Sequence, residues 1–525
     1  MNAVRPHDPT YSPWWPPATN GYLRTSLHFI VLAAACLIFA DIGITALAPW
    51  LELRRLIAGI LHPDLLSVEA WSVVWTVAFA TLGVAIGATC GLLLAVFYSR
   101  SRTVRALAIA LRSIHELFWA LLLIQIFGIG PLAGILAIGL PYSGIFGKVF
   151  AEMIEEADLA AERVLPVRTS ALSAFAYARL PDLAQRMKTY TLYRFECGMR
   201  STLVLGFIGL PTIGFHLESY FRQGHYGAAA ALLGVFFVLI GTRRLWARAT
   251  TVPLLVTTSI LLLPAATGGG SAWSNLVRFL TIEVIPAPLR DPTVHGVLTT
   301  AGALWSWLVP IFTSAILPGI ANTLILSQIA LVAMGLLALV VFPLVAQRFA
   351  GRSGHFAGRM LLVVARSTPE YMLAYVLLQT LGPSMLPAII ALAFHNGSIV
   401  GYLLGRHADQ LDYRLDAPHG LNLYSYETLP RLYGQFLAYC LYRWEIIVRE
   451  SAIFGILGVW TLGYYVDAAI SELRFDRVMV LMLATIVLTV AIDTLSRTIR
   501  NSLRISTLPT RLSDGGLVLA NKGAT

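Results

Sequence analysis

Long apolar runs of about twenty residues alternate with short polar segments along the whole chain. A helix needs roughly 20 apolar residues to cross the hydrocarbon core of a bilayer. The runs therefore predict an all-α integral membrane protein with about twelve transmembrane helices, six in each half. The predicted spans are 27–49, 72–98, 106–127, 130–153, 195–215, 227–247, 251–267, 310–345, 360–381, 384–404, 443–465 and 476–495. The seventh run is short and contains a proline, and the eighth is too long for one span.

The composition supports this class. Of the 525 residues, 57% are hydrophobic and only 13% are charged, and the mean hydropathy is +0.72. A soluble globular protein carries roughly a quarter charged residues, so an ordinary soluble protein is excluded. The four cysteines form no C-x-x-C pair, and they predict neither a disulfide framework nor a metal site.

Arginines set the predicted orientation, because cytoplasmic loops carry an excess of basic residues. Clusters follow the second, sixth, eighth and twelfth predicted spans: Arg100, Arg102, Arg105 and Arg112; Arg243, Arg244 and Arg248; Arg348, Arg352 and Arg359; Arg497, Arg500 and Arg504. These loops share one side of the membrane if both termini are cytoplasmic. Segments 1–26 and 505–525 are then cytoplasmic tails.

The chain repeats itself with a period of about 250 residues. An offset of 249 aligns LYRFECGMR at 192–200 with LYRWEIIVR at 441–449. An offset of 254 aligns three polar residues of the third span in each half: Arg112, Glu116 and Gln125 with Arg366, Glu370 and Gln379. We interpret the pattern as a tandem duplication.

The duplication predicts a first six-span domain at 27–250 and a second at 251–504. Equivalent motifs should face the same side of the membrane, so the two repeats are predicted to be parallel. Their relating axis then lies along the membrane normal, as in a fused dimer.

Two long polar segments occupy matching places, 154–192 and 406–440. Each contains a Leu-Pro pair, Leu180–Pro181 in the first and Leu429–Pro430 in the second. Ordered loops of this length are uncommon unless they have a function. We expect a short amphipathic helix on the cytoplasmic side that docks a soluble partner.

Several stretches resemble one family of membrane proteins. A glutamate followed at a fixed interval by Leu-Pro resembles the EAA loop of permease subunits in binding-protein-dependent ABC importers. The stretches RSIHELFWALLLIQIFGIGPLAG, GKVFAEMIEE and TYTLYRFECGMRSTLVLGFIGLPTIG resemble the phosphonate/phosphite/phosphate type of permease. The resemblance covers most of spans two to six and is fainter in the second half. The chain resembles two such domains fused, so that one chain replaces a permease dimer.

The resemblance implies a permease that moves a phosphorus oxyanion (phosphonate, phosphite or phosphate) through the bacterial cytoplasmic (inner) membrane by alternating access. It implies a separate cytoplasmic ATPase homodimer, which holds ATP and Mg, and an extracytoplasmic substrate-binding protein. Membrane lipid surrounds the chain, and we expect no cofactor and no nucleic acid on it.

The resemblance also marks residues for contact with the ATPase. Counting back from Leu180–Pro181 puts Glu162 at the family's loop glutamate and Arg168 where the family has glycine. The same count in the second half reaches Leu411 and Ala417, so we expect the two loops to couple unequally. The implied coupling residues are Glu162, Arg163, Arg168, Leu180, Pro181, Leu429 and Pro430.

Charged side chains at the fifth span of each half are the candidates for the translocation path. Glu196 and Arg200 are spaced i, i+4, as are Glu445 and Arg449, so each pair lies on one helix face. Three interpretations stay open: an ion pair that staples helices, arginines that line a cavity and bind an oxyanion, or a gate at the cytoplasmic mouth. Two further arginines lie nearer the cytoplasm: Arg194 and Arg443.

The third span of each half repeats this spacing. Glu116 follows Arg112, and Glu370 follows Arg366, at i, i+4, which predicts interfacial ion pairs. The deeper glutamines are either helix contacts or pore lining: Gln125 and Gln379.

The sequence carries no motif for catalysis. It has no G-x-x-x-x-G-K-[ST], G-x-S-x-G or H-E-x-x-H, so we expect a non-catalytic chain that does not hold ATP. Four histidines lack metal-ligand spacing and are predicted to be loop or interface residues: His355, His395, His407 and His419.

Two other function classes are compatible with a two-half membrane protein: a stand-alone secondary transporter of an anion with two six-span halves, and a membrane-embedded enzyme, which the missing catalytic motifs disfavour. The long polar loops lie within each half and not between the halves, which favours the importer over the secondary transporter.

Overall fold

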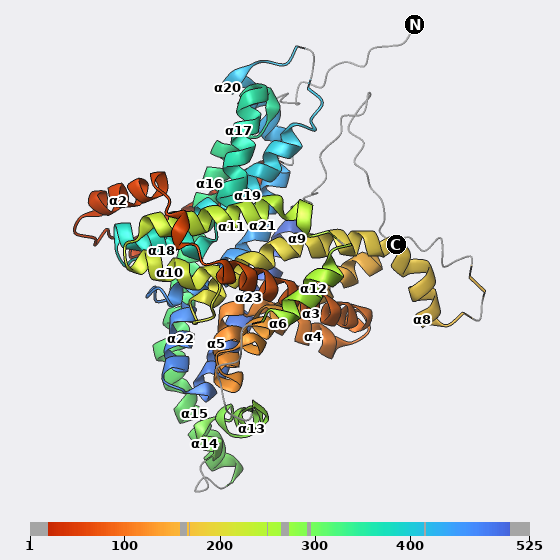
Figure 1. Ribbon diagram of the computed structural model, residues 1–525, viewed down its shortest axis with the longest axis vertical. Helices are drawn as coiled ribbons and strands as arrows, with labels where there is room; N and C mark the ends of the chain where they lie inside the picture. The colour runs from red at the N-terminus through yellow and green to blue at the C-terminus, as the bar shows by residue number, and fades with distance from the viewer. Residues whose placement is uncertain are drawn as a thin grey trace.

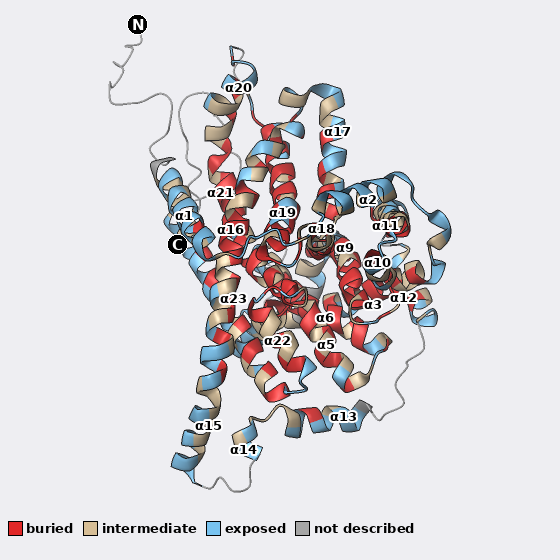
Figure 2. Cartoon of the chain, turned by 90° about the vertical axis from the view of Figure 1, so that its left-hand side faces the viewer, coloured by how far each residue is buried: buried red, intermediate tan, exposed pale blue. Residues whose placement is uncertain are grey.

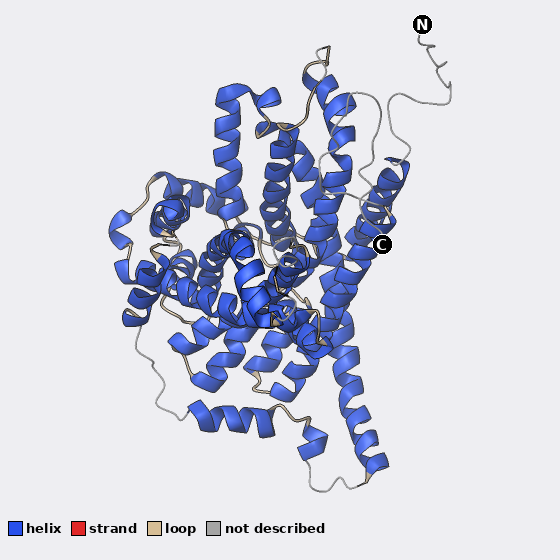
Figure 3. Ribbon diagram, turned by 90° about the vertical axis from the view of Figure 1, so that its right-hand side faces the viewer, coloured by secondary structure: helices blue, strands red, loops and turns tan. Residues whose placement is uncertain are grey.

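The computed structural model describes residues 19–157, 165–166, 169–248, 250–263, 272–290, 296–413 and 416–503. Every regular element in these ranges is a helix (Figure 1, Figure 3). Within them, seven helices are long and apolar enough to cross a membrane, or up to nine if each of two bent pairs counts as one span. The all-α membrane class is confirmed, but the count of twelve spans is not.

The helices fall into two successive sets. The first set is α1 (Thr19–Phe39), α2 (Pro49–Leu61), α3 (Ala70–Tyr98), α4 (Arg102–Ser113), α5 (Glu116–Phe127), α6 (Pro131–Glu155), α8 (Ala171–Ala174), α9 (Leu180–Gly206), α10 (Ile213–Arg222) and α11 (Tyr226–Trp246). The second set is α12 (Val252–Leu261), α13 (Ala272–Arg278), α14 (Ala287–Arg290), α15 (Val297–Ile311), α16 (Leu317–Val341), α17 (Gln347–Ser367), α18 (Glu370–Leu381), α19 (Met385–Ala408), α20 (Gly420–Asn422), α21 (Leu429–Glu450), α22 (Leu462–Ser471) and α23 (Phe475–Ser502).

The third span of each half is bent and not straight. Helices α4 and α5 meet at 96°, and α17 and α18 meet at 85°. In the first half the His115 side chain caps α5 by accepting a hydrogen bond from Leu117 N. In the second half Thr368 precedes Pro369 and is extended, because proline disfavours the helical region for the residue before it.

Three other predicted spans also differ from the structure. The seventh is reduced to α12, whose ten residues are too short to cross. The eighth belongs to one apolar stretch, Val297–Leu344, of 48 residues. The fifth span of the first half ends at Gly206, where the chain turns back into α10.

A helical hairpin of the same geometry occurs in both halves. A Cβ on Gly206 would lie 2.1 Å from the backbone of Phe215, and a Cβ on Gly455 would lie 2.1 Å from the backbone of Tyr464. Both turns contain a glycine with φ of +87°, a conformation that side chains disfavour: Gly209 and Gly458. The two helices of each hairpin can therefore approach this closely only because Gly206 and Gly455 have no side chain.

An equivalent hydrogen bond joins each hairpin to a helix of its own half. Thr76 Oγ1 of α3 accepts a hydrogen bond from Ile213 N at 2.9 Å. Thr323 Oγ1 of α16 accepts one from Leu462 N at 3.0 Å. The internal repeat seen in the sequence is therefore also a repeat of contacts.

The first helix of each half packs against the other half. Helix α1 lies along α16 and α21, where Gln328 Nε2 donates to Phe29 O at 3.0 Å. Helix α12 lies along α3, where Trp75 Nε1 donates to Leu262 O at 3.0 Å. Buried positions gather in α6, α9, α16, α19 and α21 (Figure 2), whereas α1 and α15 are mostly exposed. The domain boundary at 250/251 stays a prediction.

Candidate functional site

A cavity of about 550 Å³ lies between the two halves. Helices of both halves line it, chiefly α9 and α6 from the first and α21 and α18 from the second. Its charged lining residues are Arg112, Glu116, Lys148, Glu152, Arg194, Arg200, Glu370, Arg443, Glu445, Arg449, Glu450, Arg497 and Arg500. Eight of them are basic and five are acidic, so the lining suits an anion.

Two arginines reach across this cavity in a reciprocal way. Arg200 of α9 donates from Nη1 to the carbonyl of Arg366 at 3.1 Å. Arg449 of α21 donates from Nη1 to the carbonyl of Arg112 at 2.9 Å. Each carbonyl lies in the last turn of the helix before a bend, where carbonyl groups carry partial negative charge. The two halves are thus joined by one equivalent contact in each direction.

Arg194 is held by aromatic side chains. Its Nε donates to the Tyr190 hydroxyl at 3.1 Å, and its guanidinium lies 5.5 Å from the centre of the Tyr142 ring. A cation over an aromatic face is favourable, more so when shielded from water. Arg194 and its repeat partner Arg443 both line the cavity, on the stretch of α9 and α21 nearer the polar loops.

Of the three interpretations left open for the fifth span, the ion pair at i, i+4 is not formed in either half. Glu196 pairs with Arg243 of α11 and not with Arg200. Glu445 pairs with Arg112 Nη1 at 2.6 Å and not with Arg449. Both glutamates find arginines on neighbouring helices, so the i, i+4 spacing produced no pair on its own helix.

The predicted pairs of the third span are wrong for a related reason. The bends separate Arg112 from Glu116 and Arg366 from Glu370, so spacing on a straight helix does not apply. Glu116 instead accepts a hydrogen bond from Ser201 Oγ at 2.8 Å. The Arg366 guanidinium lies over the Tyr402 ring, 4.7 Å from the ring centre.

The two glutamines lie outside the central cavity. Gln125 is exposed and lines a second hollow of about 650 Å³, together with Asn275 of α13 and Arg290 of α14. Gln379 is partly buried in α18 and is not among the lining residues of the central cavity.

The predicted coupling residues are only partly within the described ranges. Glu162, Arg163 and Arg168 lie outside them. The Leu-Pro pairs each begin a helix, Leu180–Pro181 at α9 and Leu429–Pro430 at α21, and each helix then runs on to the cavity. In Figure 1, α20 lies at the top of the molecule and α14 at the bottom, whereas α8 lies at the right and α2 at the left. Contact with an ATPase at these residues stays a prediction.

Sequence reasoning missed part of the cavity wall. His395 lies inside α19 with 2% of its surface exposed, so its assignment to a loop or interface is wrong. Glu450 also lines the cavity, as do Ser201 and His115. These residues differ between the two halves, so the internal repeat gives no signal for them; for example, Glu450 aligns with Ser201.

Comparisons with known proteins show that this chain is similar to permease subunits of transport systems. The chain is 27% identical over 460 residues to the phosphate-import permease protein PhnE of Mycolicibacterium smegmatis, covering 82% of this chain and 84% of that protein. It is 29% identical over 239 residues to the phosphite transport system permease protein PtxC of Stutzerimonas stutzeri, covering 43% of this chain and 86% of that protein.

A third relative is the putative phosphite transport system permease protein HtxE of Stutzerimonas stutzeri, with 35% identity over 25% of this chain and 50% of that protein. No family model and no solved structure matches the chain. The predicted resemblance to permeases of this type is confirmed.

Proposed function

We propose that this chain, a relative of phosphate and phosphite permeases, is the permease subunit of an ATP-driven importer for a tetrahedral phosphorus oxyanion. The observation that carries the proposal is the basic central cavity between the halves, which Arg200 and Arg449 line from repeat-related positions. One chain then does the work of two permease subunits. The relatives and the loops within each half favour the importer over a stand-alone secondary transporter.

The arginine contacts suggest how cargo and conformation are linked. A guanidinium binds an oxyanion through two parallel hydrogen bonds, and charge-assisted bonds are roughly twice as strong as neutral ones. Arg200 and Arg449 now donate to neutral carbonyls of the opposite half. An arriving oxyanion competes for the same donors and releases these two contacts. Cargo binding therefore weakens two contacts that join the halves, as alternating access requires.

Coupling to the ATPase follows from helix continuity. Helix α9 runs from Leu180–Pro181 to the arginines of the cavity, and α21 does the same from Leu429–Pro430. A push on either Leu-Pro end shifts the arginines on the same rigid helix. The chain itself hydrolyses nothing, and a cytoplasmic ATPase pair supplies the energy. An extracytoplasmic binding protein delivers the oxyanion to the inner membrane.

Uptake tests this function in cells that lack other phosphorus importers. The cells carry the chain with its ATPase and binding protein, and they receive phosphate, phosphite or methylphosphonate as the only phosphorus source. Arg200→Ala and Arg449→Ala should each reduce uptake by about 10–100-fold, because each removes a charge-assisted hydrogen bond. Arg222→Ala is the matched control, since Arg222 has a 71% exposed side chain on α10.

Membrane insertion and ATPase binding are measured for each variant. Normal uptake by both arginine variants would contradict a path through the cavity. Failure of the wild-type chain to support growth on any of the three sources would contradict the substrate class.

A further inference from the structure

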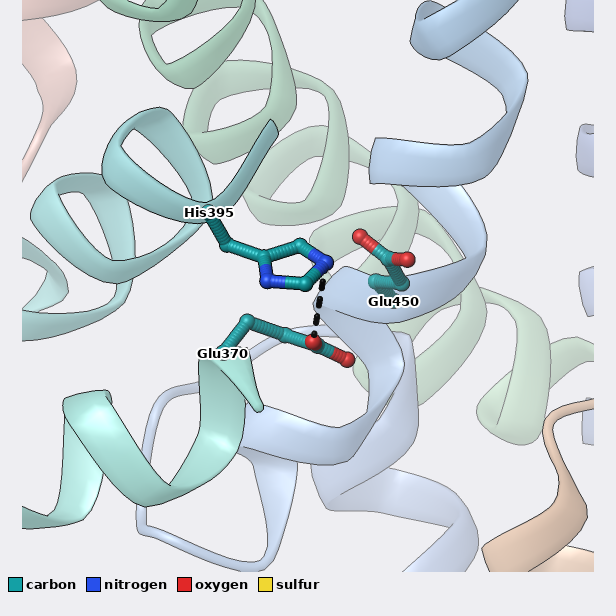
Figure 4. Close-up of side chains that lie close together, drawn as sticks. All are labelled: Glu370, His395 and Glu450. Atoms are coloured by element: carbon teal, nitrogen blue, oxygen red, sulfur yellow. Dashed lines mark ion pairs between the residues drawn. The ribbon is translucent and has the colours of Figure 1, made fainter. Parts of the chain in front are cut away.

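Three metal-binding side chains meet in the wall of the central cavity. They are Glu370 at the start of α18, His395 within α19 and Glu450 at the end of α21. One donor atom from each lies within 4.8 Å of the other two. Figure 4 shows the His395 ring pointing toward both carboxylates. The His395 and Glu370 side chains are 3% and 12% exposed, so water screens this group poorly.

The hydrogen bond on the far side of the ring orients His395. Its Nδ1 lies 2.8 Å from the carbonyl of Thr368, which can only accept, so Nδ1 carries the hydrogen. The lone pair of Nε2 then faces Glu370 Oε2 at 3.7 Å. A backbone carbonyl bonded to one ring nitrogen commonly fixes the other as a metal ligand.

The group is poorly satisfied without a cation. The two carboxylates, when ionised, and the Nε2 lone pair can only accept hydrogen bonds, so none of the three groups can donate to another. Arg200 Nη1 lies 3.2 Å from Nε2 and is the cation that this structure supplies there. Two carboxylates this close in a buried place repel each other unless a cation or proton joins them.

Two neighbouring groups support a site for a ligand. Asn396 is fully buried, and its Nδ2 donates to Glu450 Oε2 at 3.1 Å, which orients that carboxylate. The Tyr371 hydroxyl belongs to a side chain that is 97% buried and lines the same cavity. Among the described residues this hydroxyl has no hydrogen-bond partner. Buried polar atoms of this kind usually have a partner.

The first half lacks the group at the equivalent place. Counting with the two offsets puts Glu116 at Glu370, Pro141 at His395 and Ser201 at Glu450. Ser201 donates to the Glu116 carboxylate at 2.8 Å, so a neutral hydroxyl satisfies that acid. Among the described residues, the combination of two carboxylates and one imidazole within reach of one another therefore belongs to the second half.

We propose that Glu370, His395 and Glu450 bind one divalent transition-metal cation of the Mn²⁺ or Zn²⁺ type in the central cavity. One imidazole nitrogen and two carboxylate oxygens suit such ions. The cation takes the Nε2 lone pair and displaces Arg200 from it, which frees a guanidinium for an anion. The inference goes beyond the proposed function. It rests on the three donor side chains and does not depend on which substrate is transported.

Mn²⁺ binding to the purified full-length chain in lipid nanodiscs tests this site directly. Electron paramagnetic resonance measures free Mn²⁺ during the titration. The wild-type chain should bind one ion. Glu450→Gln and His395→Gln should each weaken binding at least as much as the about 10–100-fold loss that follows removal of an outer-shell partner. Glu218→Gln is the matched control, because Glu218 lies on α10 and is not among the lining residues of the central cavity, and it should bind as wild type does.

A second variant tests the role of Arg200. Because Arg200 competes for Nε2, Arg200→Ala should tighten Mn²⁺ binding. Lack of binding by the wild-type chain would overturn the proposal, as would equal binding by Glu450→Gln. Loss of the ion in Glu218→Gln would also overturn it, because binding would then not depend specifically on the three named side chains. None of these outcomes depends on transport, so they are separate from the uptake test.

Discussion

Glu196 on α9 and Glu445 on α21 occupy equivalent positions in the two halves, but they have different ion-pair partners. In the first half Glu196 pairs with Arg243 of its own half. In the second half Glu445 has no such base on α23, where Asp493 adds a second acid. Arg112 crosses from the first half and pairs with both acids, at 2.6 Å and 3.1 Å. Asp493 also pairs with Arg497 of its own helix. Glu196 is therefore paired within its own half, whereas Glu445 depends on Arg112 of the other half.

This difference shows how a duplicated chain can stop being symmetric. Arg366 is the repeat partner of Arg112, yet it lies over the Tyr402 ring and pairs with neither Glu196 nor Glu445. Two separate identical subunits would make both contacts equally. A fused chain lets each copy specialise, and the cavity wall at Glu450 and Ser201 shows the same specialisation.

Removal of Arg112 should have the largest effect on stability. Arg112→Ala leaves Glu445 without a charged partner in a buried place, and breaking such a pair costs about 3–5 kcal/mol. Arg366→Ala removes a cation–π contact, which is worth about 0.5–2 kcal/mol. The free energy of unfolding of the purified chain, from titration with sodium dodecyl sulfate, compares the two. Equal losses would contradict the asymmetry of charge.

Arg112→Lys serves as the control for this comparison. It keeps one positive charge but cannot give the two separate guanidinium contacts, so the loss should lie between those of wild type and Arg112→Ala. A loss as large as that of alanine would show that geometry and not charge matters.

The hairpin glycines should show where the halves remain alike. Gly206→Ala and Gly455→Ala each place a Cβ 2.1 Å from a backbone atom, so the paired helices must move apart. Overpacking of this kind typically costs about 1–3 kcal/mol. We expect similar losses in the same unfolding titration. Gly234→Ala on α11 meets open space and should change little. A large difference between the two hairpin variants would contradict their structural equivalence.

The smallest effect concerns the partner of Glu196. A double-mutant cycle of Glu196→Gln with Arg243→Gln should give a coupling energy of about 1 kcal/mol or more, because contacting charges couple by about 0.5–3 kcal/mol. The cycle with Arg200→Gln should give a value near zero, since Arg200 contacts other groups. The reverse order would restore the i, i+4 pair on α9.

The sequence alone predicted the membrane class and the internal repeat, and it singled out Arg200 and Arg449 as candidate residues. These two arginines are candidates because a charge inside a span has a high free-energy cost. Their partners could not be predicted, because Arg366 O and Arg112 O belong to the other half and are brought close only by the fold. Spacing along a helix could not reveal the bends, since that spacing assumes a straight helix.

His395 shows a different limit. A single histidine in an apolar run carries no spacing signal, and its two acidic neighbours come from other helices. The twelve-span count is not confirmed where an apolar run forms a hairpin or a short helix, because hydropathy measures composition and not direction.

The reactivity of Cys197 most directly tests the claim that cargo passes between the halves. Cys197 lines the cavity, and its Sγ lies 3.3 Å from Arg200 Nη2. A chain that keeps only Cys197 should lose uptake after treatment with a small methanethiosulfonate reagent, and the transported oxyanion should slow that reaction. A chain that keeps only the exposed Cys90 is the control and should be insensitive. Uptake that survives modification of Cys197, or a reaction rate that the oxyanion does not change, would contradict a path through this cavity.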